Sequence, residues 1–117
     1  MSANPCLFCK IISQQIPAKL IFETDSTLVI ADINPRAPIH YLIIPKKHVE
    51  HMGFLQPQDA DLISDMANVV QQLSKDLVQP AAFNVISNNG VGAGQSVPHL
   101  HWHFLAGKNL YSGNFKL

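Results

Sequence analysis

The chain has 117 residues, of which 47% are hydrophobic and 14% charged, so we expect one domain spanning residues 1–117. Eight Lys and Arg residues balance eight Asp and Glu residues, and Lys46-Lys47 is the nearest approach to a basic patch, which argues against long nucleic acids and favours a small ligand. No apolar stretch approaches the roughly 20 residues that span a bilayer, and residues 1–6 lack a signal-peptide pattern, so we expect no membrane association and a cytoplasmic location.

The periodicity of apolar residues and the turn-forming residues between them predict the elements in chain order. These are a short helix over 5–15, strands over 20–23, 28–33 and 39–45, a long helix over 57–79, and strands over 83–87 and 98–106. The long helix carries a single apolar stripe at spacings of three and four. This order predicts an α+β fold, with an antiparallel five-stranded sheet, one long helix on one face and a short N-terminal helix.

Cys6 and Cys9 form a C-x-x-C pair near the N-terminus. In a cytosolic protein this spacing is typical of half a zinc site or of a redox pair. A redox motif of the thioredoxin type lies between a strand and a helix, whereas this pair stands at the start of the chain, which argues against redox chemistry. Two cysteines supply half of a tetrahedral zinc shell, which histidines elsewhere would complete. Two ordinary reduced cysteines are the alternative.

Residues 99–104 read His-Leu-His-Trp-His-Phe. Because successive side chains of a strand point to opposite faces, His99, His101 and His103 are predicted to share one face, about 6–7 Å apart, with the apolar residues against a core. Neighbouring like charges lower one another's pKa, so we expect at least one neutral ring at pH 7 to act as a nucleophile. The protonated rings would donate hydrogen bonds to phosphate oxygens.

The same three histidines could instead hold a catalytic zinc ion. Against this alternative, three ligands in a row on one flat strand point in nearly parallel directions. The segment that precedes them, residues 88–96, also suits phosphate better than a metal. It has glycines at alternate positions, which let backbone amides turn towards an anion. We expect these amides, with Gln95 and Ser96, to lie beside the imidazoles, although a flexible hairpin loop is the alternative.

The stretch from Gly94 to Phe104, GQSVPHLHWHF, resembles the H-x-H-x-H signature of the histidine triad (HIT) family. Residues 37–48 resemble the family's upstream block and residues 9–19 its N-terminal block, so the resemblance spans nearly the whole chain in order. Gln95-Ser96 before the histidines and residues 105–107 after them are most similar to the nucleotide-binding, Hint-like branch. The short tail after residue 107 departs from that branch, which has a longer tail with a tryptophan near the substrate.

The resemblance implies a role for each matching residue. His101 would attack the α-phosphorus and form a nucleotidyl-histidine intermediate. His103 and the amide of Ser96 would hold the phosphate oxygens, and the Ser96 hydroxyl would lie near the leaving group. His40 would support the triad from the neighbouring strand, and His99 would be the third member of the triad.

The resemblance also implies nucleotide contacts. Asp32 would take the ribose hydroxyls, Ile33 would lie near the base, and Asn88 would approach the ribose or the phosphate. Gly94 and Gln95 would belong to the phosphate loop. The position of Asp32 at a strand end is suited to reaching a sugar diol, although a turn-capping Asp is the alternative.

Some bacterial relatives with an N-terminal C-x-x-C bind a structural zinc ion. The matching residues here are Cys6, Cys9, His48 and His99, which form a Cys2His2 set. In that case His99 is a metal ligand rather than a free participant in catalysis. His51 has no implied role, so we expect it to be a surface histidine.

The resemblance therefore implies a hydrolase that cleaves purine nucleoside 5′-phosphoramidates. A dinucleoside polyphosphate hydrolase and a non-catalytic nucleotide-binding module are the alternatives. The family resemblance also implies a homodimer.

Overall fold

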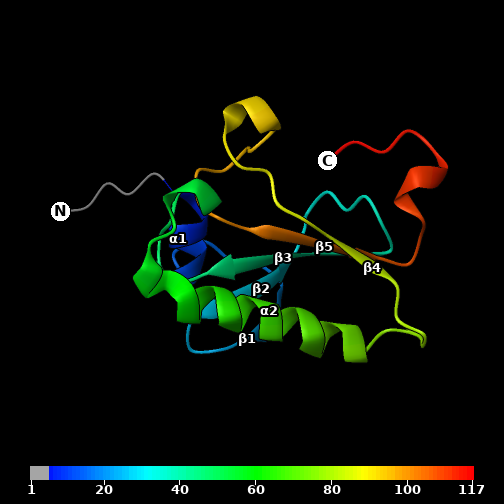
Figure 1. Ribbon diagram of the computed structural model, residues 1–117, viewed down its shortest axis with the longest axis horizontal. Coiled ribbons are helices and arrows are strands. Elements are labelled where there is room, and N and C mark those ends of the chain that lie inside the picture. Colours follow the sequence, from blue (N-terminus) through cyan, green and yellow to red (C-terminus); the bar gives the residue numbers. More distant parts are fainter. Residues whose placement is uncertain (1–5) are drawn as a thin grey trace.

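The structure is a computed structural model that describes residues 6–117. Five strands form one antiparallel sheet in the order β1-β2-β3-β5-β4 (Figure 1). The helices and strands are α1 (Leu7–Ile12), β1 (Leu20–Glu23), β2 (Thr27–Ala31), β3 (Ile39–Pro45), α2 (Ala60–Lys75), β4 (Phe83–Ile86) and β5 (Trp102–Ala106). The α+β prediction with a five-stranded antiparallel sheet is confirmed. Residues 1–5, including Pro5 at the start of the first predicted helix, lie outside the described residues.

The two faces of the sheet carry different layers. On one face, α2 packs its buried stripe of Leu62, Met66, Val69 and Leu73 against the core. On the other face, Phe8 of α1 packs with alternate residues of β2 and β3, among them Ile30 and Ile44 (Figure 1). No helix of residues 6–117 is long and apolar enough to cross a membrane.

Local hydrogen bonds end α1 and β2 earlier than the sequence predicts. Helix α1 ends at Ile12 because the amides of Gln15 and Ile16 both return to the carbonyl of Lys10, with Gln14 at a φ of 65°. Strand β2 ends at Ala31 because Asp32 Oδ1 accepts the Asn34 amide at 2.8 Å and turns the chain.

The long helix is also shorter than the predicted 57–79. Residues Pro57–Asp59 form a 3-10 turn, and α2 follows as Ala60–Lys75. Side-chain Nε2 of Gln79 donates to the carbonyls of Ser74 and Leu77, so the segment after residue 75 satisfies these carbonyls instead of continuing the helix. Strand β4 ends at Ile86, one residue before the predicted end.

The predicted strand over 98–106 is wrong in its first half, since β5 begins at Trp102. Pro98 has no amide proton, the amide of His99 bonds to the carbonyl of Val97, and the amide of Leu100 bonds to the carbonyl of Val49. His99 and His101 therefore precede the strand, and only His103 lies within it. The apolar residues nevertheless behave as predicted, because Leu100 and Phe104 are fully buried in the core under α2.

Asp65 attaches α2 to the turn between β1 and β2. Its Oδ2 accepts hydrogen bonds from the hydroxyls of Thr24 at 2.6 Å, Ser26 at 2.8 Å and Thr27 at 2.6 Å. Burial raises the pKa of Asp65, but these hydroxyls outweigh it and hold the pKa below its ordinary value. The ionised carboxylate therefore stabilises the packing of the helix on the sheet.

We predict that Asp65→Ala lowers the free energy of unfolding by about 2 kcal/mol, because three charge-assisted hydrogen bonds are lost. Because the native pKa lies below the unfolded value of about 3.9, this contribution is present above that value and is lost as the pH falls through the native pKa. Urea denaturation at pH 7 and at pH 3 measures both effects. Asp61→Ala, at an exposed position of the same helix, is the control and should change stability by less than about 0.5 kcal/mol. Equal stabilities of Asp65→Ala and Asp61→Ala at pH 7 would contradict this role.

Candidate active site and metal-binding cluster

His101 is buried and its proton position is fixed by the backbone. Its Nδ1 lies 2.8 Å from the carbonyl oxygen of His99, and because a carbonyl only accepts, Nδ1 donates. A neutral ring then carries its lone pair on Nε2. Burial lowers the pKa of His101 and outweighs the opposing bond to His99, so the ring is neutral at pH 7. The arrangement leaves Nε2 as a neutral nucleophilic nitrogen.

His103 and His40 form a second chain of hydrogen bonds. The amide of Arg36 donates to Nδ1 of His40 at 3.1 Å, so the proton of a neutral His40 is on Nε2. That nitrogen lies 2.9 Å from Nδ1 of His103 and 3.3 Å from Oδ2 of Asp32. His103 accepts at Nδ1 and therefore carries its own proton on Nε2. The supporting position predicted for His40 agrees with this geometry.

The lowered pKa values of His103 and His40 contradict the expectation that protonated rings donate to the phosphate oxygens. Burial, followed by the neighbouring charges of His101 and His40, lowers the pKa of His103 to about 4. Burial also lowers the pKa of His40, against the opposing charge of Asp32. The rings are neutral at pH 7 rather than partly protonated, so His103 offers one N–H donor and no positive charge.

Asp32, His40 and His103 bring ligand atoms within 4.8 Å of one another, close enough for a metal ion on distance alone. The proton positions argue against that use. Nε2 of His40 is the nitrogen that faces the group, and it carries the proton because Nδ1 accepts the Arg36 amide. A protonated nitrogen cannot coordinate a metal. The three residues are a hydrogen-bonded relay.

His99 is turned away from the other two triad histidines. Its Nε2 donates to the carbonyl of Pro45 at 2.7 Å, which leaves the lone pair on Nδ1. Burial, as the largest cause, lowers the pKa of His99 to about 4, so the ring is neutral. With both nitrogens directed elsewhere, His99 cannot share one zinc ion with His101 and His103. This geometry rules out the catalytic zinc alternative.

Nδ1 of His99 instead faces the C-x-x-C pair. It lies 3.2 Å from Cys6 Sγ, 3.6 Å from Cys9 Sγ and 3.2 Å from Nδ1 of His48, which is itself 3.3 Å from Cys9 Sγ. With Zn–S near 2.3 Å and Zn–N near 2.0 Å, tetrahedral ligand atoms stand about 3.3–3.8 Å apart. No disulfide joins the two cysteines. The four predicted residues therefore fit a Cys2His2 zinc site in number, chemistry and spacing.

The glycine loop differs from its predicted role. The amides of Ala93 and Gly94 bond to carbonyls of the same loop, and the amide of Gln95 returns to the carbonyl of Gly90. These N–H groups close the loop on itself, which requires positive φ at Gly90 and Gly94. The amide of Ser96 makes no such bond among the described residues, and Ser96 is exposed.

Gln95 is a brace for this loop. Its Oε1 accepts the Gly90 amide at 2.7 Å, and its Nε2 donates to the carbonyls of Glu50 at 2.7 Å and Val97 at 2.9 Å. Both Nε2 hydrogens are used within the chain, so this side chain supports the loop in which the resemblance places Gln95. Asn88 similarly donates to the carbonyl of Ala93 at 3.0 Å, and so it shapes the loop from the other side.

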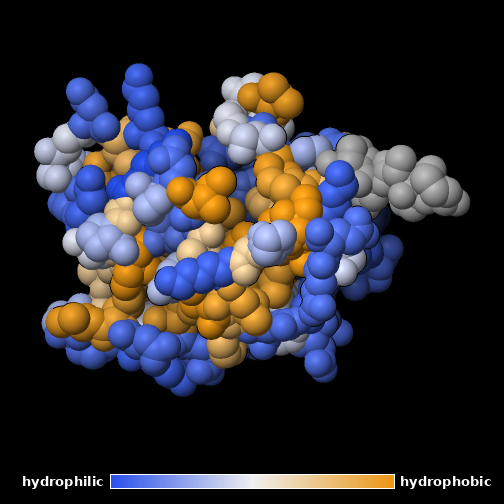
Figure 2. All heavy atoms as spheres, turned by 180° about the vertical axis from the view of Figure 1, so that it is seen from behind, coloured by the Kyte–Doolittle hydropathy of each residue, from blue (hydrophilic) through white to orange (hydrophobic). Residues whose placement is uncertain are grey.

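An apolar cavity of about 390 Å³ opens beside the histidines. Its wall includes Phe8, Ile16 and Leu42, and Asp32 and Ile33 lie at its edge. Phe8 packs edge-on against His101 with ring centroids 5.0 Å apart, so the cavity adjoins the predicted nucleophile. Figure 2 shows apolar residues gathered around a hollow on this side of the molecule. No pattern in the sequence pointed to Phe8, which lies between the two cysteines of the C-x-x-C motif.

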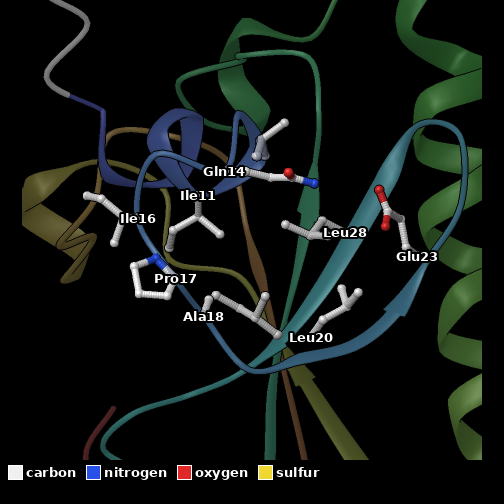
Figure 3. Close-up of a pocket in the computed structure, with 10 residues that line it drawn as sticks. Ile11, Gln14, Ile16, Pro17, Ala18, Leu20, Glu23 and Leu28 are labelled. Carbon is white, nitrogen blue, oxygen red and sulfur yellow. The ribbon is translucent and has the colours of Figure 1, made fainter.

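A second hollow of about 310 Å³ lies behind the same wall. It shares Ile11, Ile16, Pro17 and Ala18 with the first cavity, and Gln14 and Glu23 are its polar side chains (Figure 3).

His51, expected at the surface, is half-buried, and its Nδ1 accepts the Gly53 amide. Its ring also packs against Phe54, with ring centroids 4.7 Å apart.

Comparison with known proteins agrees with the sequence and the fold. A model of the HIT domain matches residues 13–110. An uncharacterized HIT-like protein from Synechocystis sp. is 38% identical over 106 residues, which cover 91% of this chain and 93% of the relative. A histidine triad protein from Clostridium difficile has a TM-score of 0.86 at 38% identity, with 99% of this chain and 100% of that chain covered.

A HIT family hydrolase from Legionella pneumophila has a TM-score of 0.84 at 36% identity and covers 92% of this chain and 96% of its own. The matched segment includes His40 and all three triad histidines. On sequence, fold and the arrangement of these histidines, the chain belongs to the histidine triad (HIT) family.

Proposed function

We propose that the protein is a nucleotidyl hydrolase that cleaves purine nucleoside 5′-phosphoramidates through a covalent intermediate on His101. The observation that carries this proposal is the bond from His101 Nδ1 to the carbonyl of His99, which leaves Nε2 unprotonated in a buried, neutral ring. The structural neighbour from Legionella described as a hydrolase supports hydrolysis as the reaction type.

In the first half-reaction, Nε2 of His101 attacks the α-phosphorus, the P–N bond breaks, and the leaving nitrogen takes a proton. In this proposal the Ser96 hydroxyl passes its proton to the leaving nitrogen and takes a proton back from the attacking water in the second half-reaction. The phosphorylated ring keeps its Nδ1 proton and becomes a cation stabilised by the His99 carbonyl. In the second half-reaction, water attacks the phosphorus, and a nucleoside 5′-monophosphate and neutral His101 are released.

The phosphate oxygens would be held by two N–H groups. These are Nε2–H of His103, fixed through His40 and the Arg36 amide, and the amide of Ser96 at the end of the braced loop. Donors whose positions are set before the substrate arrives cost no reorganisation during the reaction. The nucleoside would occupy the apolar cavity, with its ribose at Asp32 and its base beside Ile33.

We predict that His101→Ala lowers kcat/KM for an adenosine 5′-phosphoramidate by about 10³-fold or more, because the nucleophile is removed. The release of adenosine monophosphate measures this rate. His51→Ala is the matched control, since His51 lies outside the site, and it should keep activity close to that of the wild type. If wild type and His101→Ala release the product equally slowly, the proposed phosphoramidate hydrolysis is wrong.

We further propose that Cys6, Cys9, His48 and His99 hold one structural zinc ion. The ion would attach α1 to the ends of β3 and β5, and it would place Phe8 beside His101. Lys47 supports this arrangement, since its Nζ lies 2.6 Å from Asp59 and holds the segment before His48 against the start of α2.

We predict one equivalent of zinc in the purified protein and almost none in a Cys6→Ser plus Cys9→Ser variant, as measured by elemental analysis. The melting temperature of the variant should fall by about 10 °C or more. A strong chelator should lower the melting temperature of the wild type and leave that of the variant unchanged. Wild-type protein without stoichiometric zinc, or zinc retained in the variant, would overturn the proposal.

The protein is also proposed to be a homodimer. β4 is an edge strand, and its Phe83 and Val85 are 37% and 41% exposed although they lie on the α2 side of the sheet. Uncovered apolar residues on a sheet edge favour association with a second copy.

We predict that Val85→Lys converts the dimer to a monomer, because it places a charge in this apolar patch. Sedimentation velocity measures the mass. Val91→Lys, in the exposed glycine loop, is the control and should stay dimeric. A wild-type monomer, or a Val85→Lys dimer as tight as the wild type, would contradict the proposed interface.

A further inference from the structure

A cationic pocket lies under the C-terminal tail. Its cavity of about 460 Å³ is lined by Arg36 and Lys108, by Lys116, and by uncharged residues of the segment 110–115. Three of the eight Lys and Arg residues of a chain without net charge thus meet at one place. No acidic side chain lines this pocket.

These three cations have no carboxylate partner among residues 6–117. The ion pairs of the described chain involve Lys46 with Glu23, Lys47 with Asp59, and His40 with Asp32. The guanidinium of Arg36 donates only to the backbone carbonyl of Asn34, at 3.1 Å. Positive charges gathered in a concave surface without compensation attract a bound anion.

The pocket adjoins the active site through Arg36, the only arginine of the chain. Its amide donates to Nδ1 of His40, and His40 bonds to His103 at 2.9 Å. The positive charge of Arg36 also contributes to the lowered pKa values of His40 and His103, so it acts directly on the rings of the relay. Arg36 thus connects the pocket to His103 through His40.

The loop between β2 and β3 separates this pocket from the nucleoside cavity. Asp32 and Ile33 line the apolar cavity, whereas Arg36 lines the cationic pocket. Suppose that the nucleoside of a substrate lies in the apolar cavity and its α-phosphate lies at His103. Only the remaining substituent of that phosphate can then extend towards the cationic pocket. That substituent is the leaving group.

We propose that this cationic pocket binds an anionic group carried by the leaving group of the substrate. The inference rests on the proposed function and narrows its substrate class to nucleoside phosphoramidates or polyphosphates whose leaving side bears a carboxylate or a phosphate. Arg36 and Lys108, with Lys116, recognise that anion. The bond that breaks and the fate of the proton are those of the proposed hydrolysis.

A matched pair of substrates tests this subsite. The adenosine 5′-phosphoramidates of glutamate and of glutamic acid diamide share one skeleton and differ by two negative charges. We expect wild-type kcat/KM to be about tenfold higher for the glutamate compound. In a Lys108→Gln plus Lys116→Gln variant the ratio should fall to about one, since each exposed charge contact contributes up to about fivefold. Lys75→Gln, at the end of α2, should keep the wild-type ratio.

The outcomes separate this inference from the proposed function. If His101→Ala and wild type hydrolyse both compounds equally slowly, the proposed function fails. If wild type hydrolyses both at equal rates, or if the double variant keeps the wild-type ratio, the cationic subsite is wrong while the hydrolase stands. The single variants Lys108→Gln and Lys116→Gln give the same comparison should the double variant be unstable. Diadenosine tetraphosphate identifies the source of the anion, with its kcat/KM again divided by that of the diamide compound. If this ratio exceeds the ratio for the glutamate compound and is lost in the double lysine variant, the pocket binds a phosphate chain. If it is lower than the ratio for the glutamate compound, the pocket binds a carboxylate.

Discussion

The site depends on one hydrogen bond, between Nδ1 of His101 and the backbone carbonyl of His99 at 2.8 Å. A carbonyl can only accept, so this bond fixes the proton of His101 on Nδ1 and leaves Nε2 with the lone pair that the proposed attack on phosphorus needs. The residue that supplies the carbonyl is itself held at both ring nitrogens, by Pro45 and by the cluster containing Cys6. The proposed nucleophile is thus connected to the proposed zinc site through a single residue, His99.

Backbone groups also fix other side chains of the site through hydrogen bonds. The amide of Arg36 fixes the proton of His40, which fixes the proton of His103. Three backbone groups contact Gln95, which braces the loop that ends at Ser96. Because burial lowers the pKa values of His101 and His103, these contacts, and not ring charges, decide which atoms donate and which accept.

Much of the fold and part of the candidate site could be predicted from the sequence, because the patterns that indicate them are local. The period of the apolar residues predicted the strands and the buried stripe of the long helix, and the Cys-x-x-Cys spacing indicated half of a metal site. The orientation of His99 could not be predicted, since it depends on a tight turn after Pro98 and on a contact with Val49, far away in the chain. The internal bonding of the glycine loop and the place of Phe8 beside His101 likewise depend on tertiary contacts.

The proton position of His101 is the central claim, and long-range 1H–15N correlation spectra of the histidine rings measure it directly. At pH 7 we expect His101 to be protonated on Nδ1 with an unprotonated Nε2, and His40 and His103 both to be protonated on Nε2. A His101 ring protonated on Nε2, or on both nitrogens, would contradict the account, because no lone pair would then face the phosphorus.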